Sequence, residues 1–72
     1  MKEAWVGIDV AKDTLVIHVR PDHQQCSYAN TPEGWAELLA ELGSYKVQRV
    51  LLEATGGYEA GVLRYLAEAG LP

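Results

Sequence analysis

The chain has 72 residues, of which 49% are hydrophobic and 22% are charged, and its formal net charge is -4 at pH 7. This hydrophobic fraction is that of a globular protein and excludes a disordered tail or spacer. No apolar run approaches the roughly 20 residues that cross a bilayer, and the first residues lack the apolar segment of a secretory signal. We therefore expect a soluble, cytoplasmic protein with no membrane partner. Cys26 is the only cysteine, which excludes an internal disulfide and a cysteine-based zinc cluster.

The small size predicts marginal stability. A chain of this length buries only about 60% of the surface that its unfolded form exposes. We therefore expect either a homo-oligomer or a further piece of chain that completes the fold. The six basic residues are few and scattered. That composition argues against a nucleic-acid-binding surface made by these residues alone, because neutralising phosphates needs clustered Lys and Arg.

The first 30 residues predict a three-stranded meander. Residues 4–10 have the alternation of a strand, and because most of both faces is apolar, we expect it to be covered on two sides. Residues 14–20 form a second strand after a turn at 11–13, and so short a connection predicts an antiparallel hairpin. After an interruption at 21–23, the polar residues of 25–30 suit a third strand at the edge of the sheet.

A helix is predicted next. Thr31 is a good N-cap, Pro32 suits the first helical position, and Glu33 lies near the positive end of the helix dipole. Gly43 suits the C′ position that ends the helix. One apolar stripe follows helical spacing and consists of Trp35, Leu38, Leu39 and Leu42.

The last third predicts a strand and a second helix. Residues 47–54 include a continuous apolar run at 50–52, typical of an interior, parallel strand, and Glu53 stands at its end. A break at 55–57 precedes helical spacing over 58–69. The order β-β-β-α-β-α predicts an α/β domain with a mixed sheet and a helix on its face. In it, strand 47–54 lies parallel to strand 4–10 after a right-handed crossover.

Two acidic residues, Asp9 and Glu53, stand in these otherwise apolar strands. An unpaired carboxylate in such a setting is costly unless it has a partner or a metal ion. If the two strands are adjacent and parallel, both side chains emerge near the same edge of the sheet. Mg²⁺ suits that place, because it binds hard oxygen ligands and often takes only one or two protein carboxylates. A cap, an edge position, or a salt bridge with Lys12 or Arg49 is the alternative.

Three stretches carry a resemblance to a known family. They are Val6-Gly7-Ile8-Asp9-Val10-Ala11-Lys12, then Leu51-Leu52-Glu53-Ala54-Thr55-Gly56-Gly57-Tyr58, and residues 30–42, where Asn-Thr-Pro-Glu-Gly precedes an amphipathic helix. Together they resemble the N-terminal part of the RuvC-like, DEDD-type insertion-sequence transposases, which are recombinases guided by a bridge RNA. The resemblance covers essentially all 72 residues as a single partial domain, and the first two motifs are fairly specific in combination.

The resemblance implies a truncated RNase H-like fold. It also implies that Asp9 and Glu53 are the first two acids of the DEDD set, metal ligands and catalytic residues that hold Mg²⁺ for the cleavage and exchange of DNA strands. The partners it implies for the full-length protein are DNA and a guide RNA. In family members the other two aspartates, a basic segment and a domain with a serine nucleophile lie further along, and nothing in this sequence matches them. We therefore expect the 72 residues alone to be inactive.

Two other interpretations remain open. The actin-like ATPase and sugar-kinase fold shares the opening strands and a Gly-Ile-Asp strand, but its members usually follow the aspartate with small and hydroxyl residues, whereas Ala11-Lys12-Asp13 stands here. The third interpretation is a non-catalytic remnant that dimerises or serves as an interaction module. His18 is expected at the surface, and Trp5 and Trp35 in the core or at an interface.

Overall fold

A computed structural model of the chain describes residues 2–21, 23–54 and 56–71. The observed order, β-β-β-α-β-α, is the one that the sequence predicts. Asp22 and Thr55, which fall in the predicted breaks at 21–23 and 55–57, lie outside the described residues. The elements are β1 (Lys2–Val10), β2 (Thr14–Arg20), β3 (Gln24–Ala29), α1 (Pro32–Leu42), β4 (Tyr45–Ala54) and α2 (Ala60–Glu68).

The four strands form one mixed sheet in the order β3-β2-β1-β4. Strands β1 and β2 form the predicted antiparallel hairpin, β3 continues it as an edge strand, and β4 lies parallel to β1. The interior position predicted for β4 is wrong within the part of the chain that the structure describes, because β4 is the other edge of the sheet. Its apolar run at 50–52 packs on the core with one face only, since alternate residues of a strand face opposite sides.

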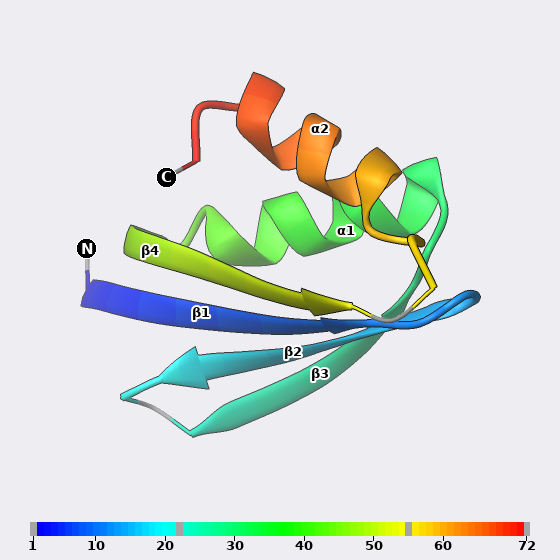
Figure 1. Cartoon of the computed structure of the whole chain (residues 1–72). Helices are drawn as coiled ribbons and strands as arrows, with labels where there is room; N and C mark the ends of the chain where they lie inside the picture. The colour runs from blue at the N-terminus through cyan, green and yellow to red at the C-terminus, as the bar shows by residue number, and fades with distance from the viewer. Residues whose placement is uncertain (1, 22, 55, 72) are drawn as a thin grey trace.

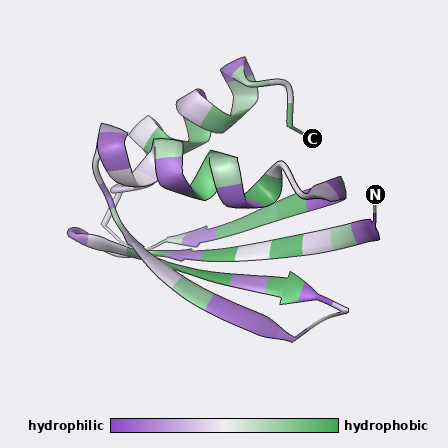
Figure 2. Cartoon of the chain, turned by 180° about the vertical axis from the view of Figure 1, so that it is seen from behind, coloured by the Kyte–Doolittle hydropathy of each residue, from purple (hydrophilic) through white to green (hydrophobic). Residues whose placement is uncertain are grey.

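Both helices lie on the same face of the sheet, so the molecule has two layers (Figure 1). Hydrophobic residues recur along each helix and alternate along the strands (Figure 2). The core between the layers is built from the inward residues of β1 and β2 and from two residues of each helix. Its buried members are Ala4, Val6, Ile8, Val10, Leu15, Ile17, Val19, Leu38, Leu42, Val62 and Leu66.

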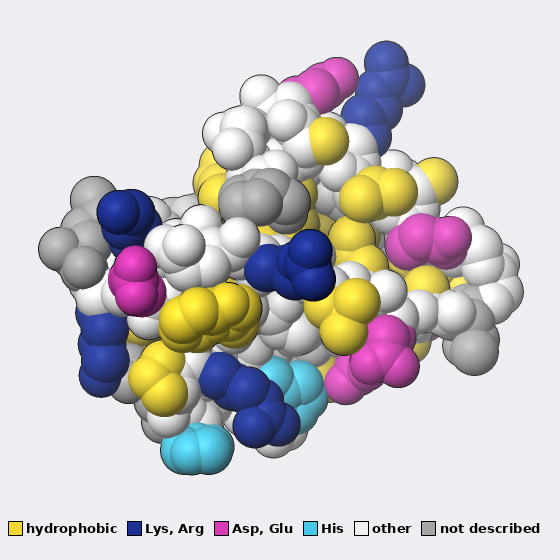
Figure 3. All heavy atoms as spheres, turned by 60° about the vertical axis from the view of Figure 1, so that its left-hand side comes forward, with side chains coloured by type: hydrophobic (Ala, Val, Ile, Leu, Met, Phe, Trp, Pro, Cys, Tyr) yellow, Lys and Arg dark blue, Asp and Glu magenta, His cyan; other side chains and the backbone are white. Residues whose placement is uncertain are grey.

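The opposite face of the sheet is open. Trp5 is 48% exposed and Leu51 is 58% exposed, and both project away from the helices, out of step with the buried residues of their strands. The expectation that strand β1 is covered on two sides is therefore wrong for the described residues. Figure 3 shows apolar side chains at the surface between basic and acidic ones. This face is where the candidate site lies.

The helix ends follow local rules, with two differences from the prediction. Thr31 caps α1, because its Oγ1 accepts a hydrogen bond of 3.1 Å from the backbone N–H of Gly34. Gly43 ends α1 in a right-handed conformation (φ -64°) and not in the left-handed one expected of a C′ glycine. Helix α2 begins at Ala60 and not near Tyr58, because Gly56 and Gly57 have positive φ angles of 78° and 77° and hold the preceding segment in turns.

Candidate functional site

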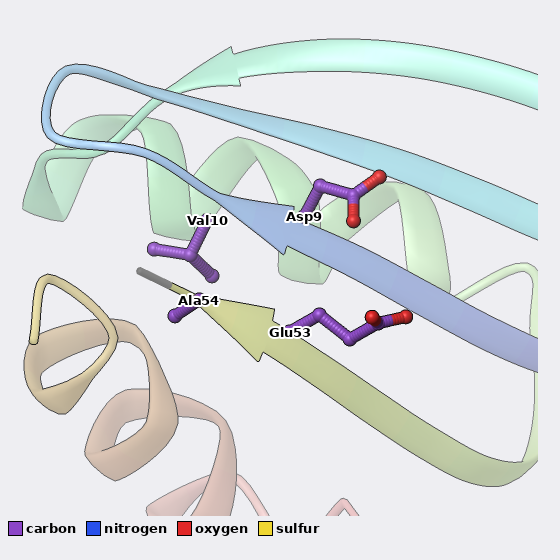
Figure 4. A pocket seen from close by; sticks show the side chains of 4 residues that line it. All are labelled: Asp9, Val10, Glu53 and Ala54. Carbon is purple, nitrogen blue, oxygen red and sulfur yellow. The ribbon is translucent and has the colours of Figure 1, made fainter. Parts of the chain in front are cut away.

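Asp9 and Glu53 are neighbours across the β1–β4 pair. Their Cα atoms are register partners one residue before the ends of two parallel strands. Because partners in adjacent strands lie about 4.8 Å apart and project to the same face, the two carboxyl groups share one end of the open face. In Figure 4 both side chains extend to the same side, away from Val10 and Ala54. These four residues line a hollow of about 320 Å³.

Both acidic side chains face solvent. The Asp9 side chain is 61% exposed, Glu53 is also exposed, and none of the described polar or charged residues is buried. The expectation that these acids are embedded among apolar side chains is therefore wrong, because only one face of β1 and β4 is covered. Water can solvate the two charges, so their proximity does not require a cation. The two adjacent carboxyl groups nevertheless provide a pair of oxygen ligands for a cation.

His18 is the partner of Asp9. Its Nε2 lies 3.3 Å from Asp9 Oδ2, with 43% of the histidine side chain exposed. His18 is the register partner of Gly7, and Asp9 is the register partner of Val16, so the contact is a diagonal one across the hairpin. Lys12 and Arg49, the alternative partners, form no ion pair with either acid among the residues that the structure describes.

The contact between His18 and Asp9 is not among the sequence predictions, although the sequence contains a signal for it. Apolar residues alternate along both strands, at positions 6, 8 and 10 and at 15, 17 and 19, and the register pairs Val10 with Leu15 across residues 11–14. This register places His18 on the same face as Asp9, two residues beyond Val16, which is the register partner of Asp9. The predicted surface position of His18 is confirmed, whereas its contact with Asp9 is not predicted.

The segments that flank the two strand ends are tied together by Asn30. Its Nδ2 donates to the carbonyl oxygens of Ala11 (2.9 Å) and Tyr58 (3.2 Å), which follow β1 and β4 respectively. Its Oδ1 accepts a 2.9 Å hydrogen bond from the indole N–H of Trp35 in α1. The chain therefore holds the turn after Asp9 and the segment after Glu53 at a common point, which fixes the end of the sheet where the acids stand.

Chemically, this arrangement supplies two adjacent carboxylates that are open to solvent. A hard divalent cation such as Mg²⁺ fits such a pair, because it keeps several waters and needs few protein ligands. No group of three or more His, Cys, Asp or Glu side chains that could hold a metal occurs within residues 2–21, 23–54 and 56–71. The described residues therefore provide two carboxylate ligands and not a complete metal-binding cage.

No family model matches the chain, and no curated protein matches it either. Among the described residues, neither helix has the length and apolar character needed to cross a membrane.

Proposed function

We propose that the chain forms the N-terminal part of an RNase H-like domain of a DNA transposase or recombinase, in which Asp9 and Glu53 bind Mg²⁺. The observation that carries the proposal is the register pairing of these two acids at the ends of the parallel strands β1 and β4. The motifs around both acids, which resemble those of RuvC-like DEDD transposases, support the same assignment. The mixed sheet with two helices on one face is compatible with it.

In this proposal the chain positions the cation through its own residues. Asp9 and Glu53 each offer carboxylate oxygens from a rigid strand, and His18 holds one oxygen of Asp9 while leaving the other available. A divalent cation in such a site stabilises the charge that develops when a phosphodiester bond is cleaved. The resemblance assigns further acids, DNA and a guide RNA to the full-length protein. We therefore propose that these 72 residues bind the cation without cleaving DNA.

Metal binding is tested with Mn²⁺ as a paramagnetic probe in NMR spectra of the whole chain. We expect selective broadening of amide signals near Asp9 and Glu53. Asp9→Asn and Glu53→Gln should each weaken binding roughly tenfold, which corresponds to about 1.4 kcal/mol. Asn and Gln keep the shape of the side chains but remove the charge that attracts a cation.

Asp13→Asn is the matched control, because Asp13 is an exposed acid in the turn after β1 and does not belong to the pair. Its Mn²⁺ affinity should equal that of the wild type. Broadening that persists unchanged in the Asp9→Asn and Glu53→Gln chains would contradict the proposed site. Mg²⁺-dependent DNA cleavage by the 72 residues alone would contradict the proposal that they bind the cation without cleaving DNA.

A further inference from the structure

The open face of the sheet carries an uncovered apolar strip across β1 and β4. Trp5 and Leu51 form it, at 48% and 58% exposure, and Gly7 lies beside Leu51 as its register partner. A Cβ atom added at Gly7 would meet nothing within 4 Å, so the surface there is hollow. A depression of about 220 Å³ covers this strip and also borders Arg20 and Arg49.

Charges of opposite sign lie on the two sides of Leu51 and Gly7, and Trp5 stands in the same row as the arginines. At one end Trp5 has Arg20 as its register partner on β2 and Arg49 as its partner on β4. At the other end stand Asp9 and Glu53. Along β4 the positions 49, 51 and 53 share the open face, so the arginine and the glutamate each lie about 7 Å from Leu51, in opposite directions. Figure 3 shows basic, apolar and acidic side chains in this succession.

We propose that a second copy of this chain covers the open face in a two-fold dimer. The two-fold axis lies between the two sheets, runs perpendicular to the strands, and passes at the level of Gly7 and Leu51. Rotation about this axis places β4 over the partner's β4 in the opposite direction. Arg49 then faces the partner's Glu53, the reciprocal pair forms by symmetry, and Leu51 meets the partner's Leu51 at the centre. Sheets packed face to face in this way lie about 10 Å apart, with their strands inclined by about 30°.

The charge pattern selects a second copy over other occupants. A two-fold interface brings each surface patch against itself, so a patch that binds its own copy must be complementary to itself. Positive and negative rows at equal distances from an apolar centre meet this condition, whereas an axis parallel to the strands would place the basic row over the partner's basic row and the acidic row over its acidic row. Without a divalent cation bound, a nucleic acid would meet two uncompensated carboxylates on the same face as the arginines, in a chain whose net charge is -4.

Within the described residues, neither Arg20 nor Arg49 forms an ion pair with a carboxylate of its own chain. Both are therefore available to the partner. Dimerisation does not depend on the proposed metal site. It would compete with that site, because the dimer places an arginine over Glu53.

Sedimentation equilibrium of the full chain over a range of concentrations tests the dimer. We expect a reversible dimer for the wild type and a roughly tenfold weaker one for Arg49→Glu or for Glu53→Arg, since each places like charges opposite one another twice. Mixing the two variants should restore association, because every charge at positions 49 and 53 then meets its opposite in the other chain. Leu51→Asp should abolish the dimer.

Matched controls exist on α2, where Arg64 and Glu68 form an exposed i,i+4 pair with Nε–Oε2 at 3.3 Å. Arg64→Glu and Glu68→Arg carry the same charge changes and should leave the dimer unaffected, and circular dichroism verifies that every variant is folded.

A wild-type chain that stays monomeric at high concentration overturns the proposal. So does a mixture of Arg49→Glu and Glu53→Arg chains that associates no better than either alone. Binding of a single-stranded oligonucleotide to the open face of a monomer would also overturn it and assign that face to nucleic acid.

Discussion

Asn30 holds together the end of the sheet where Asp9 and Glu53 stand. Its side chain uses both donor hydrogens and its carbonyl oxygen to join the segments after β1 and β4 to α1. Its backbone N–H also donates to the carbonyl oxygen of Asp13 at 3.0 Å. An amide is the one side-chain group of this length that donates twice and accepts at the same time. Replacement therefore leaves several partners unsatisfied at once.

We predict that Asn30→Ala lowers the free energy of unfolding by about 2 kcal/mol, because the half-buried indole N–H of Trp35 and the carbonyl oxygens of Ala11 and Tyr58 lose their partner at once. Asn30→Asp, although isosteric, should be at least as damaging, because a carboxylate would face the carbonyl oxygens of Ala11 and Tyr58. Urea denaturation measures both variants, with Gln25→Ala on the exposed edge strand β3 as the control. An Asn30→Asp chain as stable as the wild type would contradict this role.

Sequence reasoning places Asp9 and Glu53 correctly at two strand ends, because β propensity and chain punctuation are local signals. It does not foresee their exposure. Apolar residues such as Trp5 and Leu51 on the second face suggest a sheet covered on both sides, whereas among the described residues no element covers that face. The hydrogen bonds of Asn30 are also beyond prediction, since they join residues 19 and 28 positions away.

At the scale of elements, the start of α1 lies directly against the end of β3. Gly34 is buried in the first turn of the helix, and a Cβ atom built there would lie 1.9 Å from the carbonyl oxygen of Ala29. Because that neighbour is backbone, it cannot move aside as a flexible side chain would. The glycine is what allows the short connection at residues 30–31 to return α1 across the sheet. Amphipathic periodicity predicts the helix but contains no information about this approach.

We predict that Gly34→Ala destabilises the protein by about 2 kcal/mol, although alanine favours a helix by about 1 kcal/mol over glycine. The steric conflict with Ala29 must exceed the gain in helix propensity. Ala36→Gly, at an exposed position of the same helix, isolates the propensity effect and should cost about 1 kcal/mol. Thermal unfolding followed by circular dichroism compares the two. Stabilisation by Gly34→Ala would show that the helix is displaced from β3 without penalty.

On the scale of the whole molecule, charge is distributed unevenly between the two layers. The open face of the sheet carries both signs, whereas α1 contributes Glu33, Glu37 and Glu41 to the helical layer. Tyr28 on β3 packs against the core beneath this helix. Its pKa is raised above the ordinary value of 10.0, first because burial disfavours the phenolate, and then because Cys26, Glu41 and Glu37 add negative charge nearby.

Because of this raised pKa, the free energy of unfolding depends on pH in the alkaline range. The folded protein holds the phenolic proton of Tyr28 more tightly than the unfolded chain does. The resulting stabilisation is therefore fully present below pH 10 and is lost as the pH rises through the raised pKa. Tyr28→Phe keeps the ring and removes the titration, so its urea midpoint should fall less steeply than that of the wild type as the pH rises above 10. Tyr58→Phe, at an exposed position, should retain the wild-type slope. Parallel curves for wild type and Tyr28→Phe would mean that the contact between β3 and the acidic helix does not govern alkaline unfolding.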